Sequence, residues 1–373
     1  MRPWKSKIVA NSPLVSHTWG VTVSSLNRDV CILGLGLIGG SLLKDLQASG
    51  HSVFGYNRSA AAVTAATSEG YAADTDLAAV LTAAAKRDAL IVIATPMPAV
   101  AAMLDAIATY APTCSFTDVV SVQQAVCDLV VERGLQDRYV GSHPMAGTAH
   151  SGWEAAQEGL FHDAAWVIGF DAAAAAFASN EPVPPQWITT FVDVVALAHT
   201  VGARVIPATA ARHDAAVARI SHLPHVLAEA LSVVGDQGGA LSLSLAAGSY
   251  RDGTRVAGTQ PALVRAMCET NHAALLDALD ETITLLSEAR HTLAAQPPSV
   301  EILAEAGYRA RTRFAARSLA DGKTRPVIRL QPGADDWIHQ LMHAEHTGAV
   351  IDIFAPRPEN SGTHPNEQPD TLR

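Results

Sequence analysis

Histidine, serine and arginine side chains in four short stretches of the chain could do chemistry. His143 follows the apolar stretch 139–141, in a loop rich in proline and glycine. An imidazole with an ordinary pKa of ~6.5 can accept a proton at neutral pH, so His143 is a candidate general base. A solvated surface histidine is the alternative. Ser121 has the corresponding position after the apolar stretch 115–120, where it could instead cap a helix.

Two further pairs of polar side chains have suggestive spacings. His222 and His225 are three residues apart, which puts both on one face of a helix. Because a metal ion needs at least one more ligand, we predict hydrogen-bond donors in a cleft and no metal site; packing in the core is the alternative. Arg251 and Arg255 lie in an apolar, glycine-flanked region, where arginine could clamp a substrate carboxylate or simply face solvent.

A glycine-rich turn predicts a dinucleotide site. Gly34, Gly36 and Gly39 stand between the apolar run 30–33 and a helical pattern, the context in which G-x-G-x-x-G binds a pyrophosphate at a helix N-terminus. The second strand ends in Asn57-Arg58, without the acidic residue that would bind the ribose of NAD, so NADP is favoured and NAD stays open. The expected cofactor-binding residues are Gly34, Leu35, Gly36, Leu37, Ile38, Gly39, Asn57, Arg58, Ser59 and Thr95.

The hydrophobic pattern predicts the elements that position these residues. Apolar runs alternate with helical patterns up to about residue 208, which indicates an α/β domain with a mostly parallel sheet and the Rossmann dinucleotide-binding arrangement over residues 29–208. From 209 to 300 the pattern is helical, and we expect an all-α domain for substrate binding and homodimer formation. Expected strands lie at 30–33, 52–56, 89–94, 115–120, 139–141, 166–170 and 203–206, and expected helices at 213–234 and 260–295.

The remaining segments are predicted from composition alone. Residues 171–186 are expected to form a flexible surface loop, and 301–355 a small α/β appendage, separable from the catalytic core and regulatory or docking in role. We expect a loosely docked lead-in at 1–28 and a disordered tail at 356–373.

Composition excludes several functional classes. The net charge is −10 and no dense lysine or arginine run is present, which argues against a nucleic-acid or membrane partner. Four widely spaced cysteines favour a reduced, cytoplasmic protein, and we expect neither a signal peptide nor a membrane span. The expected partner is a small-molecule substrate.

Five sequence motifs occur in order along the chain: Gly34-Leu35-Gly36-Leu37-Ile38-Gly39-Gly40-Ser41, Ser142-His143-Pro144-Met145-Ala146-Gly147-Thr148, His213-Asp214, Ser221-His222-Leu223-Pro224-His225 and Arg251-Asp252-Gly253-Thr254-Arg255-Val256-Ala257. With these motifs the chain resembles the prephenate/arogenate dehydrogenase family of tyrosine biosynthesis. Two positions depart from the family pattern: Gln123 stands where lysine is common, and Asn57 where an acidic residue is common.

The resemblance implies an NAD(P)-dependent oxidative decarboxylation of prephenate or arogenate. His143 would accept the ring hydroxyl proton, with an apparent ionisation near ~6–7, and Ser121 would hold the hydroxyl. Arg255 would pair with a substrate carboxylate. Arg251, His222 and His225 would help to bind and orient the substrate, and Thr148 would line the pocket. Another dehydrogenase of similar outline, such as a pyrroline-carboxylate reductase, and a dinucleotide sensor without turnover remain alternatives.

Overall fold

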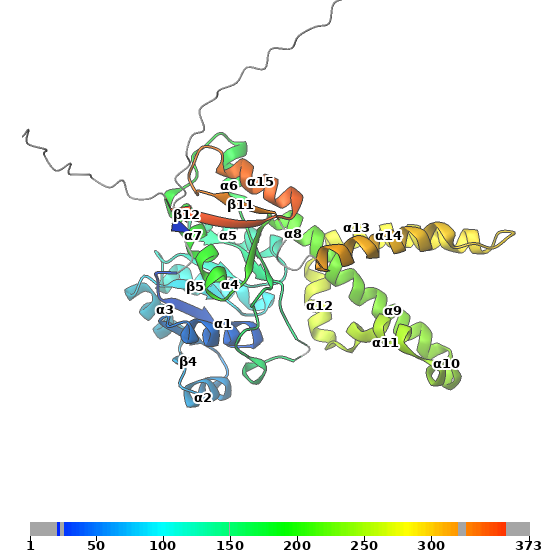
Figure 1. Ribbon diagram of the computed structural model, residues 1–373. Helices are drawn as coiled ribbons and strands as arrows, with labels where there is room; N and C mark the ends of the chain where they lie inside the picture. Colours follow the sequence, from blue (N-terminus) through cyan, green and yellow to red (C-terminus); the bar gives the residue numbers. More distant parts are fainter. Residues whose placement is uncertain (1–20, 23–25, 149, 320–325, 356–373) are drawn as a thin grey trace, which may run out of the picture.

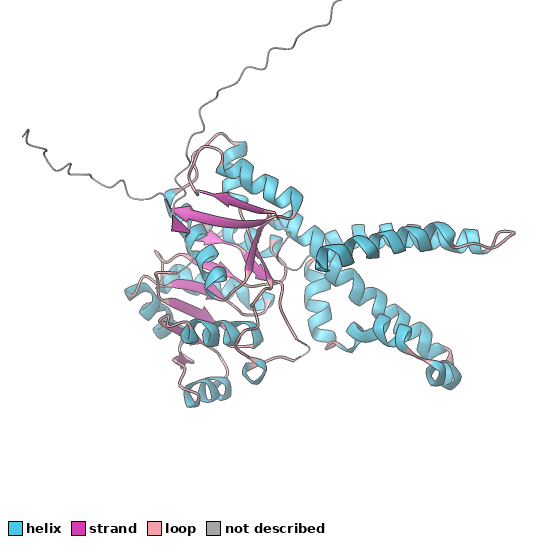
Figure 2. Ribbon diagram, viewed as in Figure 1, coloured by secondary structure: helices cyan, strands magenta, loops and turns pink. Residues whose placement is uncertain are grey.

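The computed structural model describes residues 21–22, 26–148, 150–319 and 326–355. Strands gather in one body of the molecule, and a group of helices projects from it (Figures 1 and 2). The tail expected at 356–373 and most of the lead-in expected at 1–28 lie outside the described residues.

The larger sheet has six strands, and every neighbouring pair in it is parallel. Its central strands β2 and β5 are fully buried, because helices cover both faces, and this explains their unbroken apolar sequences. The predicted parallel sheet is confirmed. In spatial order the strands are β4 (Ala73–Asp74), β3 (Val53–Tyr56), β2 (Val30–Leu33), β5 (Leu90–Ile93), β6 (Phe116–Asp118) and β7 (Tyr139–Val140). The helices between them are α1 (Leu37–Ala48), α2 (Ala60–Ser68), α3 (Leu77–Lys86), α4 (Met97–Tyr110) and α5 (Gln124–Glu132), with the 3₁₀ turn η1 (Gln136–Arg138).

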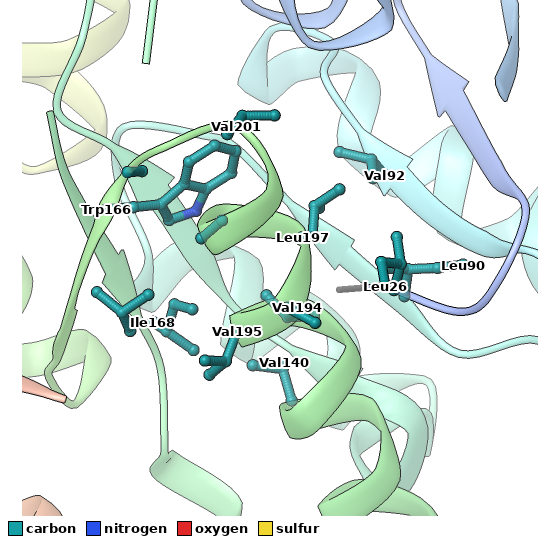
Figure 3. Packing of buried hydrophobic residues seen from close by; sticks show 14 of the residues in the cluster. Leu26, Leu90, Val92, Val140, Trp166, Ile168, Val194, Val195, Leu197 and Val201 are labelled. Carbon is teal, nitrogen blue, oxygen red and sulfur yellow. The ribbon is translucent and has the colours of Figure 1, made fainter. Parts of the chain in front are cut away.

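A second sheet continues the chain after β7. Its order is β10 (Arg204–Pro207), β9 (Ala165–Ile168) and β8 (Ser142–Pro144); β10 and β9 are parallel, and β8 is antiparallel to β9. The 3₁₀ turn η2 (Trp153–Ala155) precedes β9. The helix α7 (Pro185–Thr200) packs between the sheets. In Figure 3, Val194 and Leu197 lie between Trp166 of β9 and Val92 of β5.

The region expected to be a flexible loop, 171–186, contains the helix α6 (Asp171–Ala178). A run of alanine has high helix propensity, and Ala173 is fully buried against the core, so the helix is stabilised by packing as well as by propensity. That loop prediction is wrong for its first half.

The C-terminal segment joins the main body. A third sheet has the order β1 (Val21–Thr22), β12 (Val350–Ala355) and β11 (Val327–Leu330), and α15 (Trp337–Thr347) connects β11 to β12. The indole of Trp337 lies 5.8 Å from the ring of Phe191 on α7, and both belong to one buried cluster. This differs from the separable 301–355 appendage expected from the sequence, because residues 327–355 bury their apolar side against the sheets.

The helices between β10 and β11 form the projecting part (Figure 1). They are α8 (Ala210–Val217), the π-helical turn η3 (Ala218–His222), α9 (Leu223–Gln237), α10 (Gly239–Leu245), α11 (Gly248–Thr254), the 3₁₀ turn η4 (Arg255–Gly258), α12 (Pro261–Thr270), α13 (His272–Leu293) and α14 (Glu301–Leu319). The helix expected over 260–295 is therefore two helices that meet at Asn271. Among the described helices, none is long and apolar enough to cross a membrane.

Large apolar side chains are exposed on these projecting helices. They include Leu231, Val234, Leu241, Leu245, Leu263, Leu276, Ile283 and Leu286. A patch of this extent on one part of a protein marks an interaction surface.

Candidate active site

The glycine turn has room for a phosphate group. Gly34 has φ +109°, and a Cβ there would lie 2.7 Å from the carbonyl oxygen of Ala94, so only glycine fits. A Cβ on Gly39 would collide with the carbonyl oxygen of Gly34. A Cβ on Gly36 would meet no atom within 4 Å, and Gly36 is the N-cap of α1 without a side-chain cap. Free backbone N–H groups at that helix start therefore face open space, as a pyrophosphate requires.

The other expected cofactor residues surround this turn from adjacent strand ends. Asn57 and Arg58 directly follow β3, and the exposed Arg58 guanidinium forms no ion pair within the described residues. The hydroxyl of Ser59 caps α2 by accepting from the N–H of Ala62 at 3.3 Å. Thr95 follows β5, and its buried Oγ1 has no hydrogen-bond partner in the described part of the chain. An orphaned hydroxyl beside the glycine turn fits a ligand that is bound there.

Leu35, Leu37 and Ile38 contribute differently to this site. Leu35 is fully buried, and its Cδ2 would lie 2.7 Å from a Cβ on Gly55, so its side chain belongs to the core. Leu37 and Ile38 are partly exposed in the first turn of α1. Any polar contact from these three residues to a cofactor must come from the backbone.

His143 lies in the short strand β8, and not in a loop as the sequence suggested. Its Cα pairs with that of Val167 on β9. The Nδ1 atom of His143 is 2.9 Å from Nε2 of His213 on α8, and Nδ1 of His213 is 2.8 Å from Oδ1 of Asp214. A hydrogen-bonded chain of two imidazoles and a carboxylate results.

The surroundings of Asp214 fix the tautomers along this chain. The N–H of Gln123 donates to its Oδ1 and the N–H of Gln124 to its Oδ2, both at 2.9 Å, at the start of α5. These donors and the positive end of the helix stabilise a negative carboxylate. An ionised carboxylate only accepts, so His213 donates through Nδ1 and accepts from His143 through Nε2. The Nε2 lone pair of His143 is then left for a ligand.

The enclosure of His143 keeps its imidazole neutral. Burial, together with the neighbouring His213 and His222, lowers its pKa to about 3. The imidazole is therefore unprotonated, and able to accept a proton, over the whole physiological pH range. This corrects the ionisation near ~6–7 expected from the sequence, which assumed an ordinary histidine.

His222 connects the histidine chain to the projecting helices. It is buried in the π-helical turn, and Nδ2 of Asn271 lies 3.2 Å from its Nδ1 while also donating to the backbone oxygen of Asp214 at 2.8 Å. Since Nδ1 accepts from this amide, Nε2 of His222 has the proton and can donate to a ligand. Burial is the main cause of the lowered pKa of His222.

His225 and Arg255 face each other across α9 and η4. Burial and the charge of Arg255 lower the pKa of His225, while a backbone hydrogen bond with Val256 opposes this. The Nδ1 atom of His225 is buried without a partner in the described residues. Arg255 and Arg251 are exposed, and neither forms an ion pair within the same residues. The two exposed guanidinium groups are thus available to an anionic ligand, and Nδ1 of His225 lies beneath the surface without a described partner.

Ser121 and Thr148 differ in their relation to His143. Ser121 lies in the turn between β6 and α5, two residues before Gln123, whose side-chain amide contacts the backbone oxygen of Ser142 at 3.0 Å. That contact ties the turn of Ser121 to the strand of His143. Thr148 is exposed, and its hydroxyl accepts from the N–H of His150 at 3.2 Å. No described contact brings Thr148 to the histidine chain.

Sequence reasoning gave no role to four residues that hold this site together: Gln123, His213, Asp214 and Asn271. The adjacent His213-Asp214 pair was a usable signal, because a neighbouring carboxylate can orient an imidazole. Asn271 gave no signal, since a buried amide inside a helical pattern has no characteristic spacing. Among the described residues, no cluster of three or more histidine, cysteine or acidic side chains could hold a metal ion.

Two family models match the chain. Residues 42–177 match the nucleotide-binding domain of prephenate dehydrogenase, and residues 209–306 match its dimerization domain. The first match begins at residue 42, after the glycine turn at 34–39. The dinucleotide-binding role of that turn is therefore supported by its geometry and not by this match.

Known proteins resemble the chain over most of its length. The structure of a Corynebacterium glutamicum protein, described as a candidate prephenate dehydrogenase, is 56% identical, with a TM-score of 0.83, over 88% of this chain and 100% of that one. Prephenate dehydrogenase of Bacillus subtilis is 29% identical over 277 residues, which are 72% of this chain and 71% of the relative. The structure of Synechocystis arogenate dehydrogenase is 28% identical, with a TM-score of 0.60, over 77% and 99% of the two chains.

Proposed function

Because the chain belongs to the prephenate dehydrogenase family, we propose that it oxidises and decarboxylates prephenate with a nicotinamide cofactor. The observation that mainly supports this is the chain from His143 through His213 to Asp214, which leaves one imidazole nitrogen free as a base. Arogenate is the alternative substrate, and the resemblance to the Synechocystis enzyme favours testing it.

The free Nε2 of His143 takes the proton of the ring hydroxyl. A nicotinamide cofactor held at the glycine turn would supply the acceptor for the hydride that leaves the carbon bearing this hydroxyl. The carbon–carbon bond to the ring carboxylate then breaks, carbon dioxide leaves, and its electron pair makes the ring aromatic. His143 returns the proton to the phenolate oxygen, so protons balance. His213 and Asp214 hold the imidazole of His143 by hydrogen bonds in the tautomer that leaves Nε2 free to take the proton.

Arg255 clamps a substrate carboxylate, and His222 and His225 orient it. The support is that Arg255 forms no ion pair within the described residues, while Nδ1 of His225 lies buried and unpartnered. A bidentate arginine–carboxylate contact supplies both charge and direction. Ser121 holds the ring hydroxyl, Thr148 lines the pocket entrance, and Arg251 adds positive charge.

NADP is the preferred form of the cofactor. The glycine turn and the orphaned Thr95 hydroxyl fit a dinucleotide of either kind. The preference is supported by Asn57 and Arg58 after β3, because an uncharged side chain does not repel a 2′-phosphate and an exposed guanidinium can pair with it.

The chain forms a homodimer through its projecting helices. The match to a dimerization domain and the exposed apolar side chains of α9, α10, α12 and α13 support this. Sedimentation at micromolar concentration should give about twice the 39.1 kDa of one chain. A single species of one-chain mass would refute the dimer.

A four-way assay tests the activity. Purified protein is mixed with prephenate or arogenate, each with NADP or NAD, and the absorbance of reduced nicotinamide is followed. We expect turnover with prephenate and a higher kcat/KM than with arogenate. Turnover with arogenate and none with prephenate would identify arogenate as the substrate. Cofactor binding without turnover of either would indicate a dinucleotide sensor instead.

A further inference from the structure

A carboxylate from the C-terminal segment holds the start of the helix that bears His213 and Asp214. Oε1 of Glu345, on α15, accepts from the N–H of Thr209 at 2.7 Å and from its hydroxyl at 2.9 Å. The Glu345 side chain is 11% exposed, and its Oε2 lies 3.4 Å from Nε of Arg212. Thr209 is the N-cap of α8, so Glu345 supplies the acceptor for a backbone N–H at the start of this helix.

A second carboxylate also binds the N-terminal end of α8. Oδ1 of Asp171, on α6, accepts from the N–H of Ala210 at 2.9 Å. Two negative side chains from different segments therefore hold consecutive backbone groups at the positive end of α8. Because α8 continues without a break through η3 into α9, these two carboxylates fix the N-terminal end of one long helical run.

Thr209, which Glu345 holds, lies one helical turn before His213. The N–H of His213 donates to the carbonyl oxygen of Thr209 at 2.8 Å, so a shift of Thr209 moves the backbone of His213. The contact of His213 with His143 spans 2.9 Å and has little tolerance for such a shift. In turn, α15 is fixed by Trp337, Leu341 and Ala344, which are buried in the main apolar cluster.

We propose that Glu345 is a positioning residue for proton transfer by His143, acting through Thr209 and His213. The C-terminal unit β11–α15–β12 is thereby part of the catalytic apparatus and not a separable module. This inference depends on the proposed function only for the identity of the reaction in which His143 is the base.

Three single variants of the full chain test the proposal. Glu345→Ala removes the acceptor and should lower kcat by about ten- to a hundred-fold, the cost of a slightly misplaced catalytic group. The cofactor Kd should stay the same, because the glycine turn is untouched. Glu345→Gln keeps an amide oxygen that accepts both hydrogen bonds and should restore kcat to within about three-fold. Arg212→Ala, the matched control, removes the contact to Oε2 alone and should leave kcat unchanged.

A spectroscopic readout separates this inference from the proposed function. In protein with isotope-labelled histidine, the Nδ1–H signal of His143 reports its hydrogen bond to His213 without any substrate. We expect this signal to shift or broaden in Glu345→Ala and to return in Glu345→Gln. An unchanged signal and an unchanged kcat in Glu345→Ala would overturn the proposal, whichever substrate the enzyme accepts.

Thr209→Val covers the case in which Glu345→Ala does not fold. It removes the hydroxyl donor, keeps the backbone donor, and should lower kcat by about two- to ten-fold with the melting temperature nearly maintained. A wild-type kcat in Thr209→Val would then overturn the proposal.

Discussion

The surroundings of His143 and of Arg255 differ in how many polar atoms are already satisfied. Around His143, hydrogen bonds join His143 to His213 and His213 to Asp214. The carboxylate of Asp214 in turn accepts from two backbone N–H groups at the start of α5. Around Arg255, the guanidinium is exposed and the neighbouring Nδ1 of His225 has no described partner.

This difference separates two tasks. A base must be held in one geometry before the substrate arrives, because reorganisation during the reaction would raise the barrier. A carboxylate clamp must leave its donors free, since a pre-existing ion pair would compete with the substrate. In the proposed site, β8, the start of α5 and α8 hold the base in place, and α9 and η4 carry the carboxylate clamp.

Removing the base should have the largest effect. His143→Asn can still hydrogen-bond the hydroxyl but cannot take its proton, so kcat should fall by about 10²–10⁴-fold with little change in KM. Steady-state kinetics with saturating cofactor measures this. His150→Asn, in the exposed loop nearby, is the control and should behave like the wild type. Near-normal kcat in His143→Asn would locate the base elsewhere, with His222 or His225 as the next candidates.

Removing the clamp should affect binding instead of rate. Arg255→Ala leaves a substrate carboxylate without its partner, and substrate affinity should fall by about ten- to a thousand-fold while cofactor Kd stays unchanged. Arg265→Ala removes another exposed guanidinium, which is paired with Glu269 on α12, and should change neither affinity. If both affinities fell together in Arg255→Ala, the residue would be structural and the proposed division of tasks would fail.

Removing the guanidinium after β3 should change cofactor choice alone. A charge-assisted contact to a phosphate is worth about 1.5–3 kcal/mol, so Arg58→Ala should raise the KM for NADP about ten-fold or more and spare that for NAD. Lys86→Ala, which removes one exposed positive charge at the end of α3, should alter neither value. An unchanged ratio of the KM for NADP to the KM for NAD in Arg58→Ala would refute the preference for NADP.

The pH profile should show the smallest effect. Burial lowers the pKa of His143 to about 3, so its protonation, which abolishes the base, takes place well below the ordinary histidine range. Between pH 8 and 5.5, kcat should therefore vary by only about two-fold. A steep loss of kcat with a midpoint between pH 6 and 7 would mean that His143 titrates as an exposed residue and that this half of the site is not enclosed.

The sequence predicts the parts of the molecule whose signals are local. The unbroken apolar runs of β2 and β5 identify buried parallel strands, and the glycines at 34, 36 and 39 identify the turn between strand and helix. By contrast, Glu345 lies 136 residues from Thr209 in the chain, and nothing near either residue predicts their contact. The alanine-rich stretch of α6 and the prolines that follow it favour a loop by composition, whereas the burial of Ala173 that stabilises the helix depends on contacts distant in the chain. The pKa of His143 depends on its burial by several segments of the chain, which the hydrophobic periodicity of the sequence does not predict.

The π-helical turn Ala218–His222 has a consequence for how relatives of this protein can diverge. Each helical residue advances the azimuth by about 100°, and a π turn accommodates one residue more than an α turn would. Deleting one residue there would leave a regular helix, but it would rotate α9 and the apolar surface beyond it relative to the sheets. It would also rotate His225, which lies on α9, relative to the sheets. An insertion or deletion in these five residues would therefore move both the histidine that we propose orients the substrate and the surface that we propose forms the dimer, so natural variants should exchange side chains here while keeping the residue count.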